Sequence, residues 1–282
     1  MSLNIISLAS GSSGNSTIIF TDDTAIMIDS GLTAREIKNR LNMCNFSPKQ
    51  INGVILTHAH KDHYRSVGTL SKKFDIKIYT EEETYNTILT KDNKNMLSKI
   101  ETVYETPYRI GDIEIVMFSV SHGITIPAGK PIGLLFINNE KKIGYITDLG
   151  YVTDEIKEIL KGCNKIFIEA NYDEKIIKRK LSDKKYNSQW WYLKWVMSNM
   201  GHLSNEQCAD ALSDMVTEKT EEIFLAHISQ NHQDPDMDNN NFDLASDHVK
   251  YILKKNGKHV PKIYKTYRKG RDKTWNPVKG SF

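Results

Sequence analysis

The stretch that decides the fold is ILTHAHKDHYRS, Ile55 to Ser66, which places three histidines and an aspartate within six residues, directly after an apolar run. His58 and His60 alternate as they would on an extended segment, so both rings can point the same way. Asp62 and His63 follow on the turn that leaves this strand. Imidazoles and a carboxylate suit zinc, manganese or iron, and this mixture favours two adjacent ions over one closed structural site. A chance cluster of surface histidines is the alternative.

Further ligand types stand at the ends of other predicted strands. His122 ends EIVMFSVSH, Asp148 ends KIGYITD, and His227 ends EIFLAH. Each precedes a loop, where functional residues gather on a rigid scaffold. Taken singly, each is more often a hydrogen-bonded histidine or a helix-capping aspartate. Four similar placements together indicate a site.

The stretch resembles the metallo-β-lactamase-fold hydrolases, whose HxHxDH signature it matches. The resemblance implies an α/β fold, a four-layer αββα sandwich, with two divalent metal ions at the edge of the paired sheets. The ions are expected to be zinc or manganese, with iron as an alternative. A hydroxide between them would be the nucleophile. By this resemblance one metal is held by His58, His60 and His122, the other by Asp62, His63 and His227, and Asp148 bridges both.

Other motifs resemble one branch of these hydrolases, the YycJ/WalJ group of exonuclease-like proteins. They are SLASGSSGNS, TDLGY, IEANYD, GHLSN and LAHIS, and they run from Leu8 to Ser229. A more distant resemblance is to ribonuclease Z. The chain departs from the group's pattern at Gly123, which follows His122, and at His232 and Gln233, where the group has an asparagine pair.

His202 precedes a predicted helix. Ser204 and Gln207 form a capping-box pattern, so the helix begins just after His202. A helix N-terminus has free N–H groups and a partial positive charge, so His202 can hold a phosphate or protonate a leaving oxygen. The alternative is an ordinary cap with an incidental histidine. Asp62 and His202 are the residues we expect to act in catalysis.

Six polar residues are predicted to bind substrate at the rim of the site. The loop LASGSSGNS lacks the GK[ST] of a phosphate-binding loop and leads into a strand, so it is expected to be a glycine-permitted turn facing the metals. An ordinary turn is the equal alternative. Glu169 and Asn171 end another strand near the same edge. The six residues are Ser12, Ser13, Asn15, Glu169, Asn171 and Ser204.

The 38 basic and 35 acidic residues give a net charge of only +3 for the whole chain, but two segments are strongly basic. The first is a basic and aromatic excursion at about 171–200. The second is a basic C-terminal tail at about 258–282, whose eight Lys and Arg against one acid give +7. Cationic groups bind phosphates and aromatic faces stack on unpaired bases. A solvated edge strand plus tail is the alternative for the tail.

The 282 residues are predicted to form a single domain, 1–282. The start has no signal-peptide pattern and no segment could span a bilayer, so no membrane partner and a cytoplasmic location are expected. Three cysteines outside any CxxC pair are expected to be reduced and mostly buried.

The predicted function is a metal-dependent hydrolase: a two-metal phosphodiesterase that cleaves nucleic acid, DNA in particular. A 5′-to-3′ exonuclease activity comes from the resemblance alone. The alternatives are hydrolysis of a small ester, thioester or phosphodiester, an RNA-processing nuclease on the same scaffold, and a non-enzymatic interaction module.

Overall fold

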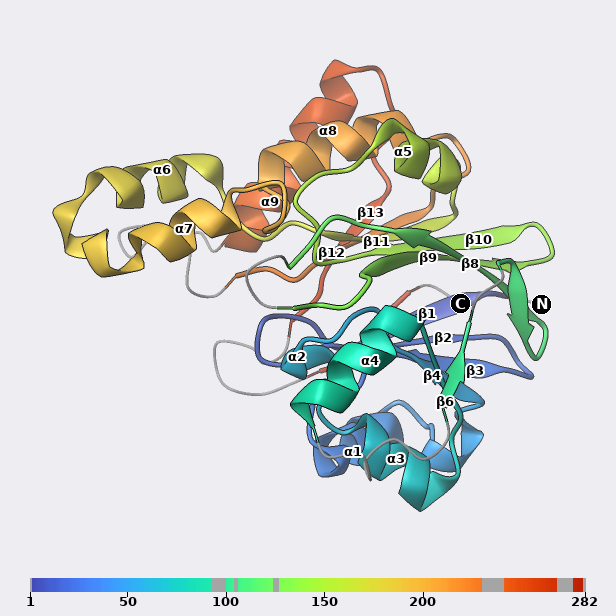
Figure 1. Ribbon diagram of the computed structural model, residues 1–282. Helices are drawn as coiled ribbons and strands as arrows, with labels where there is room; N and C mark the ends of the chain where they lie inside the picture. The colour runs from blue at the N-terminus through green and yellow to red at the C-terminus, as the bar shows by residue number, and fades with distance from the viewer. Residues whose placement is uncertain are drawn as a thin grey trace. The chain divides into compact units, whose positions relative to one another are not determined.

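The chain folds into two compact units, each assembled from separate stretches of sequence. The computed structural model (Figure 1) describes residues 2–92, 100–103, 106–123, 127–229, 241–267 and 276–280. Unit 1 comprises Met1–Ser119, Thr125–Lys141 and Tyr267–Phe282. Unit 2 comprises Val120–Ile124 and Lys142–Thr266. The single domain expected over 1–282 stays a prediction.

The first sheet belongs to unit 1 and has the strand order β14-β1-β2-β3-β4-β5-β6. Its pairs are antiparallel from β14 to β3 and parallel from β3 to β6. Apolar runs rich in isoleucine form these strands, and β1 is buried along its whole length. The strands are β1 (Asn4–Ala9), β2 (Ser16–Phe20), β3 (Ala25–Ile28), β4 (Gly53–Ile55), β5 (Ile78–Thr80), β6 (Ile100–Thr102) and β14 (Val278–Lys279).

In the described residues of unit 1, four α-helices and one short 3-10 helix connect the strands. Thr33 caps the first helix with a complete capping box, its side chain accepting from Glu36 N. Ile37 and Leu41 of that helix are fully buried in the core that also holds Ile18 and Val54. The helices are α1 (Ala34–Met43), η1 (Pro48–Gln50), α2 (Lys61–Tyr64), α3 (Val67–Phe74) and α4 (Glu82–Lys91).

The second sheet has the strand order β13-β12-β11-β10-β9-β8-β7. Its strands β7 to β9 pair antiparallel, whereas β10 to β13 of unit 2 run parallel. The central parallel strands β11 and β12 are buried throughout, as strands covered on both faces must be. The strands are β7 (Tyr108–Ile110), β8 (Ile113–Ser119), β9 (Ile132–Asn138), β10 (Lys141–Ile146), β11 (Lys165–Glu169), β12 (Glu222–Ala226) and β13 (Lys262–Lys265).

The helices of unit 2 divide into a packed group and a projecting arm. Helix α8 packs against α5 and α9, and α9 packs on β12. The arm, residues 173–196, consists of α6, η3 and α7 and extends away from α8 in Figure 1. It lies within the segment of about 171–200 for which the sequence predicts a basic and aromatic excursion. The helices are α5 (Asp154–Leu160), α6 (Glu174–Ser182), η3 (Lys184–Gln189), α7 (Trp190–Val196), α8 (Asn205–Met215) and α9 (Asn241–Lys255).

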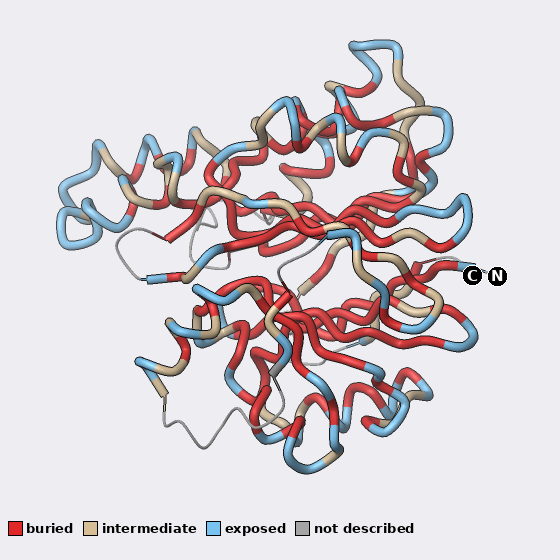
Figure 2. The backbone as a smooth tube through the Cα atoms, turned by 45° about the vertical axis from the view of Figure 1, so that its right-hand side comes forward, coloured by how far each residue is buried: buried red, intermediate tan, exposed pale blue. Residues whose placement is uncertain are grey.

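Burial is highest in the strands of each unit, as Figure 2 shows in red, while the arm carries long exposed stretches. The three cysteines are buried and free of disulfides, as expected. None of the helices in the described parts of the chain is long and apolar enough to cross a membrane. Part of the expected C-terminal tail, residues 268–275 and 281–282, lies outside the described residues.

Candidate active site

The HxHxDH residues of unit 1 converge just beyond strand β4. His60 is the N-cap of the short helix α2, so the chain turns there and brings Asp62 and His63 back toward His58. His58 Nε2 lies 3.0 Å from His60 Nδ1, and the rings of His58 and His63 have centroids 4.0 Å apart. Asp62 Oδ2 lies 3.5 Å from His63 Nε2. The structure therefore gathers the four predicted ligands of this motif into one cluster.

Asp29 lies beneath this cluster and orients it. Its fully buried carboxylate is 2.7 Å from His63 Nδ1 and accepts hydrogen bonds from the backbone N–H and the hydroxyl of Thr57. The Thr57 hydroxyl lies 3.1 Å from His58 Nδ1. Both Nδ1 atoms thus face Thr57 or Asp29, so Nε2 is the nitrogen that His58 and His63 can offer to a metal ion. A carboxylate behind a histidine is a common way of fixing the tautomer of a metal ligand.

Asn15 holds the same cluster from the glycine-rich loop. Its amide Nδ2 donates to Asp62 Oδ2 at 3.2 Å and lies 2.9 Å from His63 Nε2. Its backbone N–H donates to the Asp62 carbonyl. A Cβ on Gly31 would meet that carbonyl oxygen at 1.5 Å, so only glycine permits this close approach. Ser12 and Ser13, the other loop residues predicted to bind substrate, are exposed.

The predicted site residues of unit 2 surround Glu169, at the end of β11. Glu169 Oε1 lies 2.8 Å from His202 Nδ1 and 2.7 Å from His227 Nδ1, and Oε2 accepts from the N–H groups of Leu149 and Leu203. Burial raises the pKa of Glu169, but the charges and hydrogen bonds of His202 and His227 outweigh burial and hold that pKa well below its usual range. Glu169 is therefore an anion that orients both rings.

Asp148 and His122 complete the group in unit 2. Asp148 Oδ1 lies 3.5 Å from His227 Nδ1, 3.8 Å from His202 Nδ1 and 3.9 Å from His122 Nε2. His122 Nδ1 is 2.8 Å from the carbonyl oxygen of Gly201, so its Nε2 is turned toward Asp148. Each of these side chains is nearly or fully buried.

Three candidate residues leave their strands in the left-handed backbone region. The φ angles are 58° at Asp29 after β3, 58° at Asp148 after β10 and 49° at His227 after β12. Aspartate and histidine are among the side chains that enter this region more readily than most. Such strain persists where the surroundings hold it, and it often marks functional sites. All three residues therefore lie at backbone turns just after the carboxyl ends of their strands.

Two other residues predicted to bind substrate are buried and have structural partners. Ser204 is the N-cap of α8, its side chain accepting from Gln207 N in the expected capping box. Asn171 donates to the His227 carbonyl oxygen at 2.7 Å. Substrate binding by these two residues, and by Glu169, stays a prediction. What the structure shows is that Glu169 contacts both His202 and His227, that Asn171 contacts His227, and that Ser204 caps the helix that follows His202.

The donor set fits divalent metal ions. In unit 2, Asp148, Glu169, His202 and His227 each offer a donor atom, and these atoms all lie within 4.8 Å of one another. In unit 1 the imidazoles of His58 and His63 are turned so that Nε2 can coordinate, and His60 points Nδ1 toward His58 Nε2. Buried imidazoles and carboxylates are the ligand types that zinc and manganese take.

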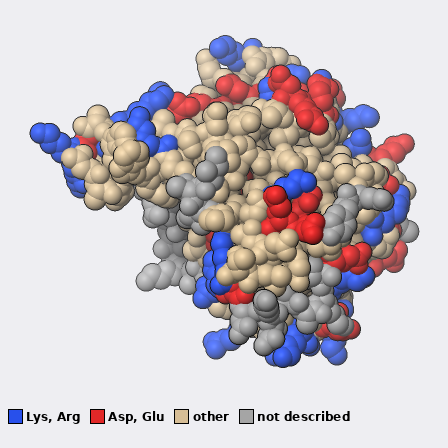
Figure 3. Space-filling model, in the orientation of Figure 1, with Lys and Arg blue, Asp and Glu red and all other residues tan. Residues whose placement is uncertain are grey.

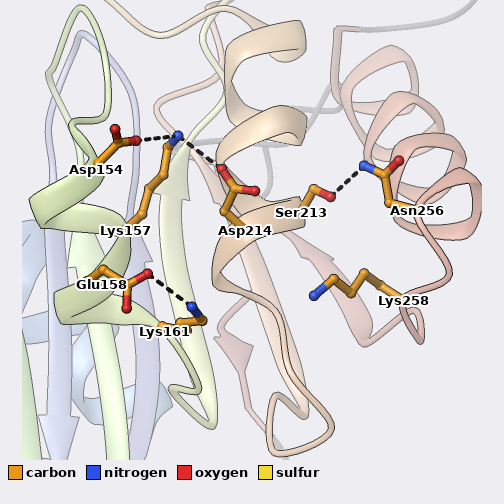
Figure 4. Close-up of a pocket in the computed structure, with 8 residues that line it drawn as sticks. All are labelled: Asp154, Lys157, Glu158, Lys161, Ser213, Asp214, Asn256 and Lys258. Carbon is orange, nitrogen blue, oxygen red and sulfur yellow. Dashed lines mark hydrogen bonds and ion pairs between the residues drawn. The ribbon is translucent and has the colours of Figure 1, made fainter.

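A separate pocket of unit 2 lies among α5, α8 and the end of α9, and none of the histidines discussed above lines it (Figure 4). Its charged groups largely satisfy one another: Lys157 bridges Asp154 and Asp214, each at 3.0 Å, and Lys161 pairs with Glu158. We assign it no role in the chemistry.

Sequence reasoning missed Asp29, Thr57 and Trp195. Asp29 ends the apolar strand AIMI just as Asp148 follows KKIGYI, so the same strand-end signal could have found it. Thr57 carries no such signal. Trp195 of α7 packs its ring 5.3 Å from His202 and 5.9 Å from His122, a contact that no sequence pattern predicts.

Comparison with known proteins finds a matching family and several similar proteins. Residues 24–228 match the family described as β-lactamase superfamily domain. Exodeoxyribonuclease YycJ of Bacillus anthracis is 31% identical over 273 residues, which is 95% of each chain. Exodeoxyribonuclease WalJ of Streptococcus pneumoniae D39 is 33% identical over 230 residues, 79% of this chain and 80% of that protein. The metallo-β-lactamase fold protein YhfI from Bacillus subtilis superposes with a TM-score of 0.66 at 12% identity, covering 99% of both chains.

These matches confirm the predicted α/β sandwich of two mixed sheets flanked by helices and the resemblance to the YycJ/WalJ group. One departure from the group's pattern has a visible reason: Gly123 has φ 86° and donates its N–H to the Met200 carbonyl, a left-handed conformation that favours glycine. His232 and Gln233, the other departure, lie outside the described residues.

Proposed function

Because the chain belongs to the β-lactamase superfamily and is a metal-dependent hydrolase, we propose that it is a two-metal phosphodiesterase that degrades DNA. The observation that carries this proposal is the combination of two preorganised His/Asp clusters with 31% identity, over 95% of the chain, to a protein named exodeoxyribonuclease. The 5′-to-3′ direction of degradation is part of the proposal.

The ligands are assigned by the family resemblance. His58, His60 and His122 would hold one ion, Asp62, His63 and His227 would hold the other, and Asp148 would contribute to both. Asp29 supports the assignment because it holds His63 through Nδ1. The His122 contact with the Gly201 carbonyl supports it in the same way. When bound, such ions polarise a phosphoryl oxygen and lower the pKa of water toward ~7.

The chain's own residues would orient the substrate and move protons. His202 has its Nδ1 fixed on Glu169, so Nε2 is the nitrogen that can meet a phosphate oxygen or protonate the leaving oxygen. His202 also stands two residues before the N-cap of α8, where peptide dipoles favour an anion. Asp62, partly exposed and held by Asn15, would orient the attacking group.

End-labelled substrates test the proposal. Metal-reconstituted protein is incubated with single- and double-stranded DNA and RNA carrying a label at the 5′ or the 3′ end. We expect early release of short labelled products from 5′-labelled DNA, and cleavage that weakens steeply as salt rises. Asp62→Asn should abolish cleavage. Asp75→Asn, the same change at an exposed aspartate after α3, should leave cleavage at the parental rate.

Three results would contradict the proposal. One is absence of bound metal in well-folded protein. Another is faster cleavage of RNA than of DNA, which would favour the RNA-processing alternative. The third is turnover of a small phosphodiester or ester that is independent of salt, together with no cleavage of any polynucleotide.

A further inference from the structure

The arm carries a charge and an aromatic content unlike the rest of the chain. Residues 173–196 contain seven Lys and Arg against three acids, a net +4, while the whole chain has only +3. They also hold three of the four tryptophans. Figure 3 shows blue side chains along this projection. A positive, aromatic surface is complementary to a polyanion whose bases are accessible.

The arm is a structured element with a small core of its own. Ile177, Leu193 and Val196 of the arm form this core together with Tyr172, the residue just before the arm, and all four are almost completely buried. Leu193 and Val196 are three residues apart and so face the same side of α7. The arm can therefore present fixed side chains on its surface.

Large aromatic side chains remain outside that core. Trp191 is 81% exposed, Tyr192 46% and Trp190 36%. The Trp190 and Trp191 rings meet edge to face, with centroids 4.9 Å apart. Lys194 Nζ lies 5.5 Å from the Trp190 ring centroid, so a cation accompanies the aromatic faces. Exposed apolar groups in such a cluster mark interaction sites.

The aromatic series continues from the arm to the predicted catalytic histidine. Trp191 and Trp195 are four residues apart and hence neighbours on the surface of α7. The Tyr192 ring lies 6.0 Å from that of Trp195, which lies 5.3 Å from that of His202. His202 donates its N–H to the Val196 carbonyl at 2.9 Å, which fixes the end of α7 next to the histidine.

We propose that the aromatic side chains of α7, namely Trp190, Trp191, Tyr192 and Trp195, form a track that binds single-stranded nucleic acid. Unpaired bases would stack on Trp191 and Tyr192, and the lysines of the arm would contact phosphates. The inference rests on the proposed nuclease function and adds the form of its substrate. Bases in an intact duplex are already stacked on one another and paired, so they cannot stack on these aromatic rings. The arm would thus select unpaired strands and guide them toward His202.

Binding of single strands compared with duplex tests this. Metal-loaded parent and variants are titrated against fluorescent phosphorothioate-linked oligothymidylate and a blunt duplex of equal length, and anisotropy is followed. Trp191→Ala should weaken single-strand binding roughly 5- to 150-fold, the scale expected when one base no longer stacks, while duplex binding changes less than about twofold. Trp191→Phe should retain most of the affinity. Tyr251→Ala, at a 60% exposed aromatic of α9, is the matched control and should bind like the parent.

Each of the following outcomes would overturn the inference. Unchanged single-strand binding by Trp191→Ala, when the parent binds and cleaves DNA, overturns the track alone and leaves the nuclease proposal standing. Equal weakening for strand and duplex overturns the selection of unpaired bases. A changed oligomeric state in sedimentation, without changed DNA binding, assigns the exposed tryptophans to a second copy of the chain. A parent that neither binds nor cleaves any nucleic acid overturns the proposed function, and this inference with it.

Discussion

Replacing Asp29 by asparagine should weaken metal binding by the proposed ligand cluster of unit 1 while leaving the backbone of that unit intact. The side chain keeps its volume, and asparagine tolerates the left-handed backbone at φ 58°. Asparagine can still accept from Thr57 N–H through its oxygen. Its amide group, however, would then donate toward His63 Nδ1, where the carboxylate now accepts at 2.7 Å. His63 would change tautomer and carry its proton on Nε2, which then cannot coordinate.

The magnitude follows from the hydrogen bond that the substitution removes. Carboxylates that orient a metal-ligating histidine typically account for about 10- to 100-fold in metal affinity, which corresponds to about 1.4–2.7 kcal/mol. The variant exchanges a charge-assisted hydrogen bond for a neutral one, which costs about 1 kcal/mol of folding free energy. Asp29 is fully buried, so water does not screen this difference.

Metal affinity and stability should be measured separately. Competition with a chelator gives the affinity, and urea unfolding of metal-free protein gives the stability. Asp75→Asn is the control, because Asp75 is exposed and has φ 62°. It should change neither quantity. If Asp29→Asn binds metals with parental affinity, the orientation of His63 by Asp29 is irrelevant to coordination and the reasoning is wrong.

Other perturbations separate the roles of neighbouring residues. Gly201→Ala would bring a Cβ within 2.2 Å of the Trp195 carbonyl oxygen, so we expect about 1–3 kcal/mol lower stability in urea unfolding and slower cleavage; parental values would contradict this. His227→Asn should lower metal content and activity together, whereas His202→Asn should keep the metals and lose roughly 100- to 10,000-fold in single-turnover rate. The reverse pattern would exchange their roles. Burial raises the pKa of Cys163 to about 12, so this thiol should resist a disulfide reagent at pH 8 until urea unfolds the chain, and rapid labelling of native protein would refute that.

The fold could be predicted because ligand types repeat at strand ends. HxHxDH follows β4, Asp148 follows β10 and His227 follows β12, and each position is visible as a polar residue after an apolar run. The structure gathers the predicted metal ligands of each unit and adds Glu169 between His202 and His227. Local patterns sufficed for these positions.

The contacts that hold the predicted ligands in place could not be predicted from the sequence. The Thr57 hydroxyl meets Asp29, 28 positions away in the sequence, and the absent side chain of Gly31 makes room for the distant backbone of Asp62. Ser204 and Asn171 carry polar groups near the motifs, which suggested substrate binding; that role stays a prediction, and the burial of both residues was not visible in the sequence. Whether a polar group near a motif faces solvent or protein depends on tertiary contacts that no local period encodes. The expected tail illustrates the same limit, because Val278 and Lys279 pair with β1 as an edge strand.

The left-handed backbone at Asp29, Asp148 and His227 also limits which amino acids these positions can accept, in evolution or in protein design. A β-branched residue there would be penalised by the backbone before any metal chemistry is considered. A library selected only for folded protein should therefore accept asparagine and glycine at Asp148 and His227 and reject valine and isoleucine. A drifting copy of this gene would lose its metals first through such asparagines, and an inactive descendant would still fold. Absence of the histidines and aspartates is thus a poor sign that the scaffold has been lost.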